Sequence, residues 1–187
     1  MRRFATAFLL VMLAIWQPSL AQSGHEHHEE LWHGTWYGMD LADVKARVPG
    51  AVALQAPAES AGKEVPLLQI PVYRVGNGDF KVTCYFVDGK LRWVGFALLG
   101  QLNYEAAMDV FNSVHRTLTY KYGMPFHVAE RAGVNSRANV AEWRINANGG
   151  GTVFMIVGAT LNSSGSGNVA SLRINYTNAT ALDAEKL

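Results

Sequence analysis

The chain has 187 residues, and its 16 lysines and arginines against 15 aspartates and glutamates leave a formal net charge of +1. A near-neutral chain in which no basic cluster stands out offers no electrostatic attraction for nucleic acid or for an anionic membrane surface. Binding to nucleic acid is therefore not expected, and the length fits one domain behind a short leader.

The first 21 residues have the layout of a secretory signal peptide. Arg2 and Arg3 form a positive start, an apolar run follows at 4–16, and small residues lead to Ala21. The run is too short to span a bilayer, which needs roughly 20 apolar residues. Cleavage after residue 21, or alternatively after Ser23, is expected to release a soluble periplasmic or secreted protein. No second apolar segment is long enough to cross a membrane, so stable membrane insertion is not expected. No cysteine stands near the cleavage site, so a lipid anchor is not expected either.

Residues 22–34 form a His/Glu-rich segment that we expect to be flexible. Imidazole nitrogens and carboxylate oxygens can bind zinc, copper or nickel, so the segment is a candidate for weak metal binding. All the ligands are crowded into one stretch without apolar support, however, and a solvated tail is the other reading. The histidines concerned are His25, His27, His28 and His33.

A single α+β domain is expected over residues 35–187, and it opens with a short helix between Asp40 and Pro49. Asp40 is placed to cap the N-terminus of this helix, and Asp43 adds a negative charge in the first turn, where the helix dipole favours it. Pro49 and Gly50 end the helix. Because few of its residues are apolar, the helix must pack against something larger.

A run of strands is predicted after a loose linker at 55–64. Pro66 and Pro71 indicate that the first strand is bulged or lies at a sheet edge, because proline cannot donate a hydrogen bond to a neighbouring strand. The pair Asp88–Gly89 between the second and third strands predicts a hairpin with a type I′ turn. The three strands cover residues 65–75, 79–87 and 90–99.

The register of this hairpin decides which side chains share a face of the sheet. Counting from the turn, we expect Phe86 opposite Leu91 and Cys84 opposite Trp93. One face is then apolar and belongs on the helices, whereas the other is richer in aromatic and basic side chains than a wet face requires. This second face is a candidate protein-binding surface, unless a loop or the other half of the sheet covers it. Its residues are Lys81, Tyr85, Arg92, Val94 and Phe96.

A longer helix is predicted over residues 104–122, with Asn103 as its cap and with Gly123 and Pro125 at its end. The order of elements, short helix, strands, long helix, strands, predicts an α+β fold. We expect an antiparallel sheet of six or seven strands with both helices on one face. The similar layout of the two halves is compatible with a duplicated helix-plus-strands unit. The last strand candidates are residues 139–148, 152–161 and 169–178.

Familiar catalytic motifs are missing from the sequence. It has no nucleophile elbow and no His-Glu-x-x-His helix, and the glycines at 162–168 lack the spacing of a phosphate loop. Cys84, the single cysteine, alternates with apolar residues and is expected to be buried and structural. His115 and His127 are isolated, so a packed or surface position is expected for each. These observations leave an enzyme open but favour a non-catalytic role.

Three stretches, "GMDLADVKARVPGA", "FVDGKLRWV" and "YKYGMP", combine a capped helix, an Asp-Gly hairpin and a helix end. They resemble the small α/β modules of BamE-like envelope lipoproteins and of β-lactamase inhibitor proteins, over about half of the mature chain. Those families bind proteins, so the resemblance implies protein binding here. This chain lacks the anchoring cysteine of the first group and the disulfides of the second, and no functional residue is carried over.

The sequence as a whole predicts an exported, soluble, non-enzymatic protein of the bacterial envelope that binds a protein partner through a sheet face and needs no cofactor. The alternative is a periplasmic metal-binding or metal-handling protein that uses the His/Glu-rich segment.

Overall fold

The computed structural model describes residues 30–58, 61–133, 136–145, 151–161 and 167–178. The predicted signal peptide, residues 22–29 of the His/Glu-rich segment and residues 162–166 lie outside this part of the chain. Within the described residues, no helix is long and apolar enough to cross a membrane.

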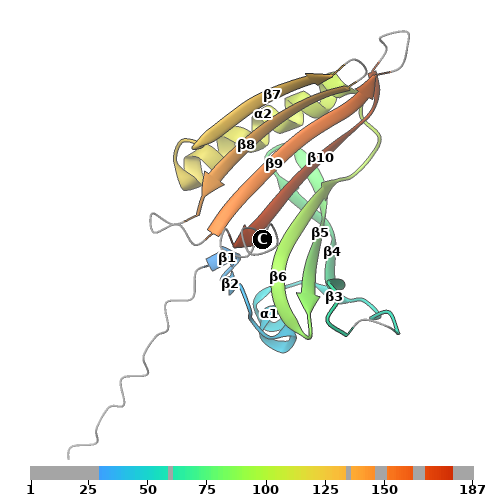
Figure 1. Cartoon of the computed structure of the whole chain (residues 1–187), viewed down its shortest axis with the longest axis vertical. Coiled ribbons are helices and arrows are strands. Elements are labelled where there is room, and N and C mark those ends of the chain that lie inside the picture. The colour runs from blue at the N-terminus through green and yellow to red at the C-terminus, as the bar shows by residue number, and fades with distance from the viewer. Residues whose placement is uncertain (1–29, 59–60, 134–135, 146–150, 162–166, 179–187) are drawn as a thin grey trace, which may run out of the picture.

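Most of the described chain forms one eight-stranded antiparallel sheet in the order β3-β4-β5-β6-β10-β9-β8-β7 (Figure 1). A two-stranded ribbon of β1 and β2 and two helices complete the fold. The elements in chain order are β1 (Glu30–Trp32), β2 (Thr35–Trp36), α1 (Leu41–Arg47), β3 (Val52–Ala53), β4 (Val65–Val75), β5 (Gly78–Val87), β6 (Lys90–Leu98), α2 (Tyr104–Tyr122), β7 (His127–Gly133), β8 (Ser136–Arg144), β9 (Gly151–Leu161) and β10 (Gly167–Asn178).

The α+β class is confirmed, but the main sheet has eight strands where six or seven were expected. The two strands that sequence patterns missed are its edges, β3 and β7. The first is only two residues long, and the second exposes nearly all of its side chains. Neither carries the apolar alternation by which a half-buried strand is recognised.

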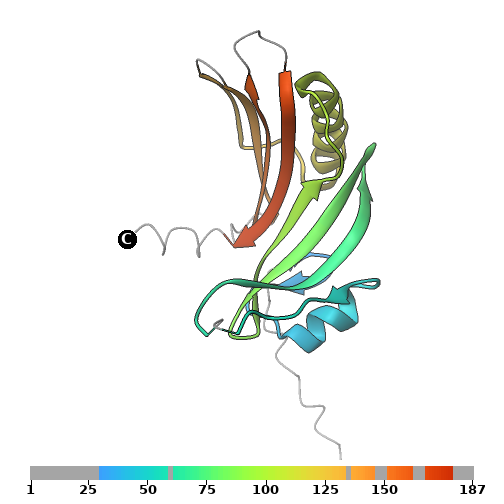
Figure 2. The same ribbon diagram turned by 90° about the vertical axis from the view of Figure 1, so that its right-hand side faces the viewer.

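In chain order, each of the two helices is followed by a set of four strands of the main sheet. α1 precedes β3 to β6, α2 precedes β7 to β10, and the sets meet where β6 pairs with β10 (Figure 1). Both helices lie on the same side of the sheet (Figure 2), and their buried residues join one hydrophobic core. The similar layout of the two halves that the sequence indicated is therefore present in the order of elements.

The two helix N-termini differ in how they are stabilised. The bounds of α2 are those predicted, and Asn103 caps it by accepting a hydrogen bond from the backbone N–H of Ala106 at 2.8 Å. Asp40 occupies the cap position of α1 but makes no cap hydrogen bond. Its carboxylate instead forms an ion pair with the Lys90 ammonium, with 2.9 Å between Oδ1 and Nζ. The predicted capping role of Asp40 is thus replaced by a contact across the fold.

The β5–β6 hairpin turns at Asp88 and Gly89 with φ values of 49° and 75°, as a type I′ turn requires. Next to the turn the register is the predicted one, with Phe86 opposite Leu91. In β4, the register shifts near Pro66 and between Ile70 and Tyr73, so the prediction of a bulged strand is correct.

Farther from the turn, a β-bulge at Arg92 overturns the predicted register. Cys84 is opposite Val94, and Tyr85 is opposite Trp93. A bulge places one extra residue on one strand, and a shift of one residue moves every following side chain of that strand to the other face. Trp93 therefore lies on the face away from the helices, and Val94 lies in the core.

The ribbon of β1 and β2 contributes to the core. Leu31 and Trp32 are almost fully buried, and the Trp32 ring meets Phe96 edge-on with centroids 5.2 Å apart. The folded domain therefore includes residues 30–34, which we expected in the flexible segment. The polar, histidine-rich sequence around Leu31 and Trp32 did not indicate that these two side chains would pack into the core.

Candidate functional site

The face of the main sheet opposite the helices is covered by no described helix, and we call it the helix-free face. Its side chains alternate with those of the core along each strand. Across β4, β5, β6 and β10 the register places them in three rows: Lys81, Ala97 and Arg173; then Gln69, Thr83, Gly95 and Asn175; then Pro66, Tyr85, Trp93 and Thr177.

The five residues predicted for a binding surface do not stay together. Lys81 and Tyr85 lie on the helix-free face. Val94 and Phe96 are 0% and 2% exposed and belong to the core. They are therefore not available to a partner, because the bulge at Arg92 turns both of them inward.

Arg92 itself is also directed away from the helix-free face. It is half-buried, donates a hydrogen bond to the Tyr37 hydroxyl, and holds its guanidinium carbon 5.1 Å from the centroid of that ring. Tyr37 packs against the core. Arg92 thus connects the bulge to the segment before α1, and it does not join Lys81 and Tyr85 on the helix-free face.

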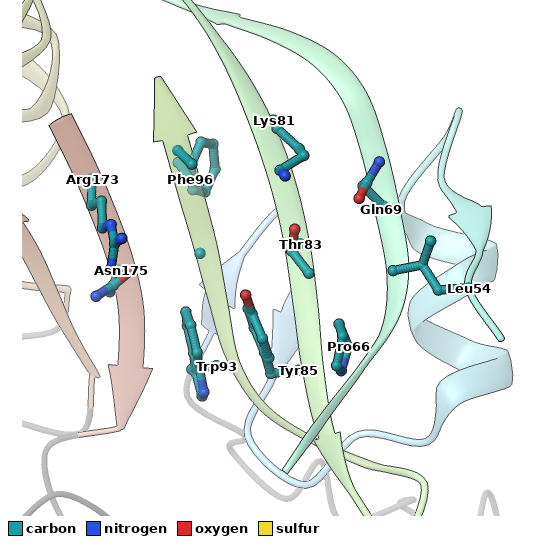
Figure 3. Close-up of a pocket in the computed structure, with 12 residues that line it drawn as sticks. Leu54, Pro66, Gln69, Lys81, Thr83, Tyr85, Trp93, Phe96, Arg173 and Asn175 are labelled. Atoms are coloured by element: carbon teal, nitrogen blue, oxygen red, sulfur yellow. The ribbon is translucent and has the colours of Figure 1, made fainter. Parts of the chain in front are cut away.

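The most prominent feature of the helix-free face is a stacked aromatic pair. The rings of Tyr85 and Trp93 are 3.7 Å apart between centroids with an interplanar angle of 8°, and both side chains are only half-buried (Figure 3). The Trp93 indole N–H donates to the Glu64 carboxylate. This bond fixes the orientation of the indole while leaving ring surface open to solvent.

A hollow lies beside this pair, over the middle of β6. Gly95 and Ala97 are the two small residues of β6 on the helix-free face, and longer side chains rise on either side of them from β5 and β10 (Figure 3). The resulting pocket has a volume of about 390 Å³. Its lining residues are Leu54, Pro66, Gln69, Lys81, Thr83, Tyr85, Trp93, Gly95, Ala97, Arg173 and Asn175, together with Phe96, whose side chain belongs to the core.

The charges at this pocket are both positive. Lys81 and Arg173 pair with the same residue, Ala97, from its two sides, so their Cα atoms are about 10 Å apart across two strand spacings. Both side chains are exposed, and neither forms an ion pair with another described residue. The hollow is thus flanked by two cations that form no ion pair with a described residue.

Sequence reasoning missed three of the residues that define this pocket. Trp93 was placed on the wrong face because the bulge is invisible to simple alternation. Arg173 and Asn175 alternate with Leu172 and Ile174 in the last strand, and this pattern marked them as facing away from the core. What no local pattern indicated was that β10 would pair with β6 and bring them beside Lys81.

The described residues hold no group of three or more side chains arranged for a metal ion. Of the four histidines predicted as ligands, only His33 is described. Its ring lies edge-on to Trp32 at 4.8 Å, and its Nε2 is 3.3 Å from the Tyr73 hydroxyl. His25, His27 and His28 lie outside the described residues.

The candidate catalytic side chains are far apart. Cys84 is buried as predicted, and desolvation raises the pKa of its thiol to about 12, which keeps it protonated at neutral pH. His115 packs against Trp143 with ring centroids 5.1 Å apart, and burial lowers its pKa. Trp143 is on β8, four strand spacings or about 19 Å from β5. The described residues therefore do not bring this thiol and this imidazole together.

The chain is accordingly an α+β protein built on an eight-stranded antiparallel sheet, with an aromatic and basic pocket on the face that its helices leave open. No family model, curated protein or solved structure matches it.

Proposed function

We propose that this chain is an exported, non-enzymatic binding protein of the bacterial envelope, and that it holds a protein partner on the helix-free face. The observation that carries the proposal is the Tyr85–Trp93 stack. Two large, flat, half-buried aromatic rings stand beside a pocket of about 390 Å³ on this face. The resemblance to envelope modules that bind proteins points in the same direction.

This site is already organised for association. Tryptophan, tyrosine and arginine dominate the binding energy of protein interfaces, because large rings bury much area while few torsions are frozen. Here the Trp93 ring is held by Tyr85 on one side and by Glu64 at its N–H. Little side-chain entropy is left to lose on binding, and a rigid sheet supports the site from below.

The site supports binding better than catalysis for a chemical reason. The lining residues include two cations, two amides, the hydroxyls of Thr83 and Tyr85, and the stacked rings of Tyr85 and Trp93, but no carboxylate, histidine or thiol. General acid–base chemistry near neutral pH needs a group that can exchange a proton there, and nucleophilic catalysis needs an activated hydroxyl or thiol. Thr83 is the only hydroxyl nucleophile among the aliphatic side chains of the pocket, and no lining residue can serve as its base.

The test begins by chemical cross-linking of the mature protein in native envelope extract, followed by purification of the captured protein and measurement of its affinity. Trp93→Ala is expected to weaken binding at least tenfold, as truncation of an interface hot spot does. Tyr120→Ala is the matched control, since Tyr120 is 95% exposed but lies on α2, on the other side of the sheet.

Equal affinities of Trp93→Ala and Tyr120→Ala for the captured protein would contradict the proposal. Circular dichroism of both variants checks that each still folds. A parallel capture with a chelator separates the alternative: a partner that is lost with the chelator, and kept by Trp93→Ala, would assign binding to the His/Glu-rich segment instead.

A further inference from the structure

We infer that the partner presents an acidic segment to the helix-free face. One of its carboxylates enters the hollow over Ala97 between Lys81 and Arg173, and an adjacent flat or apolar side chain packs on the Tyr85–Trp93 stack. This inference rests on the proposed function and names the chemistry of the partner.

The first support is the imbalance of charge on this face. Four basic side chains lie on the helix-free face and form no ion pair with another described residue, whereas the acidic ones are Glu142 and, at the rim, Glu64. Other charges near the face are neutralised, as Arg74 is by Asp79 at 2.8 Å. Two of the four basic residues lie beside the hollow, and the other two lie farther along the same face on β7 and β8. The four basic residues are Lys81, Arg131, Arg144 and Arg173.

The second support is the geometry of the hollow. Ala97 presents only a methyl group between the longer side chains of Lys81 on β5 and Arg173 on β10 (Figure 3). With about 10 Å between their Cα atoms, Lys81 and Arg173 can both reach an anion held between them. Thr83 and Asn175 flank Gly95 in the next row and add neutral donors toward the same place. A planar carboxylate suits the guanidinium of Arg173 in particular.

The third support is the arrangement of charge and aromatic surface. The stack lies two rows from the cations, because Tyr85 is four residues from Lys81 on the same strand and face. Two rows on one strand span about 13 Å, which an extended segment covers with about four residues. A carboxylate and a ring separated by a few residues in such a segment can therefore occupy both places at once. A lone small anion would use the cations and leave the aromatic pair exposed.

The experiment measures the binding of three sets of labelled peptides to the full mature chain. In the first set glutamates flank a tryptophan at spacings of one to four residues, and the second and third sets carry glutamine or lysine in place of glutamate. Fluorescence anisotropy measures their affinities. The glutamate peptides are expected to bind about tenfold more tightly than the glutamine peptides, since two exposed ion pairs each contribute a few-fold. The preference should shrink as salt is added.

Two matched charge reversals locate the effect. Lys81→Glu with Arg173→Glu is expected to abolish the preference for glutamate. Lys45→Glu with Arg116→Glu makes the same change of net charge on exposed positions of the two helices and is expected to preserve it. Equal binding of glutamate and glutamine peptides, or no binding of any set at millimolar concentration, overturns the inference. So does a preference that survives the reversal at Lys81 and Arg173.

The captured envelope protein separates this inference from the proposed function. A partner whose binding is weakened by Trp93→Ala, but not by the double reversal at Lys81 and Arg173, leaves the proposed function standing and removes the acidic segment. If no captured partner responds to Trp93→Ala, the proposed function fails, whatever the peptides do.

Discussion

The Trp93 ring occupies the space that a side chain at position 95 would fill, and Gly95 leaves that space free. The two residues follow each other on the same face of β6, and a Cβ atom built on Gly95 would collide with the Trp93 ring. The edge of the indole therefore lies over the following residue of its own face, Gly95, and in this position the ring stacks on Tyr85. The position of the aromatic pair thus depends on the absence of a side chain at Gly95.

Gly95→Ala is expected to displace Trp93 and break the stack while leaving the core in place. The loss of the aromatic pair should lower the free energy of unfolding by about 1 kcal/mol and reduce partner binding as strongly as Trp93→Ala does. Near-UV circular dichroism and the tryptophan emission spectrum report the movement of the ring.

Gly158→Ala is the control for that experiment. Gly158 lies on the same face in β9, but a Cβ there meets its nearest atom, the carbonyl oxygen of Arg137, at an ordinary 3.6 Å. It should change neither spectrum nor binding. If both alanines behave alike, the close approach of Gly95 and Trp93 is not what positions the stack.

Phe96→Ala is expected to lower the free energy of unfolding by about 3–5 kcal/mol, as large cavities in cores do. The ring is packed among Trp32, Tyr73 and Tyr176, with centroids 5.2 to 6.0 Å away. Urea denaturation measures the loss. Lys81→Ala, an exposed position on the neighbouring strand, should stay within about 0.5 kcal/mol of the wild type. A small effect at Phe96 would place this side chain on the surface, as simple alternation had predicted.

Shortening the chain at its N-terminus should show where the folded domain begins. A protein that starts at Glu30 is expected to fold like the full mature chain. One that starts at Thr35 loses Leu31 and Trp32, both almost fully buried, at a cost on the order of 5 kcal/mol. Thermal unfolding followed by circular dichroism distinguishes the two. Equal melting temperatures would show that the ribbon of β1 and β2 adds nothing to the core.

The same pair of truncations sharpens the metal test. The protein that starts at Glu30 lacks three of the four histidines predicted as ligands but keeps an intact fold. Zinc titration of this protein and of the full mature chain, followed by calorimetry, therefore reports on the tail without unfolding the domain. Partner capture should be the same for both proteins if the helix-free face is the binding surface.

Above pH 9 the buried thiol of Cys84 should make stability fall with pH. The unfolded thiol loses its proton near its ordinary pKa of 9.0, whereas the folded thiol keeps it up to a pKa of about 12. The folded state then binds more protons, so the free energy of unfolding declines through this window and is unaffected by this group below it. Between pH 8 and pH 10 the wild type should lose about 1 kcal/mol more than Cys84→Ala, as measured in urea. Parallel curves for the two proteins would contradict a buried, protonated thiol.

Local sequence patterns determined where most elements lie. The bounds of α2, its Asn103 cap and the turn at Asp88 depend on residues within a few positions of one another, and all three are as predicted. The same holds for the strands of the hairpin, because apolar alternation and an Asp-Gly turn are local signals.

The edges of the sheet and the pairing of β6 with β10 could not be predicted in this way. The pairing of β6 with β10 joins residues 76 or more positions apart, such as Ala97 and Arg173. The sequence of neither strand indicates which other strand it will pair with. An edge strand such as β7 exposes side chains on both faces because only one neighbouring strand covers it, so it carries little apolar alternation.

What the sequence determined by itself was thus a set of helices and strands, an α+β class and the two residues Lys81 and Tyr85 of the pocket. The tertiary structure decided which of the remaining side chains face a partner. That choice depends on the bulge at Arg92, whose guanidinium binds Tyr37, 55 positions earlier in the chain. One extra residue in a strand exchanges its two faces, and only a contact made by the folded chain fixes where that residue sits.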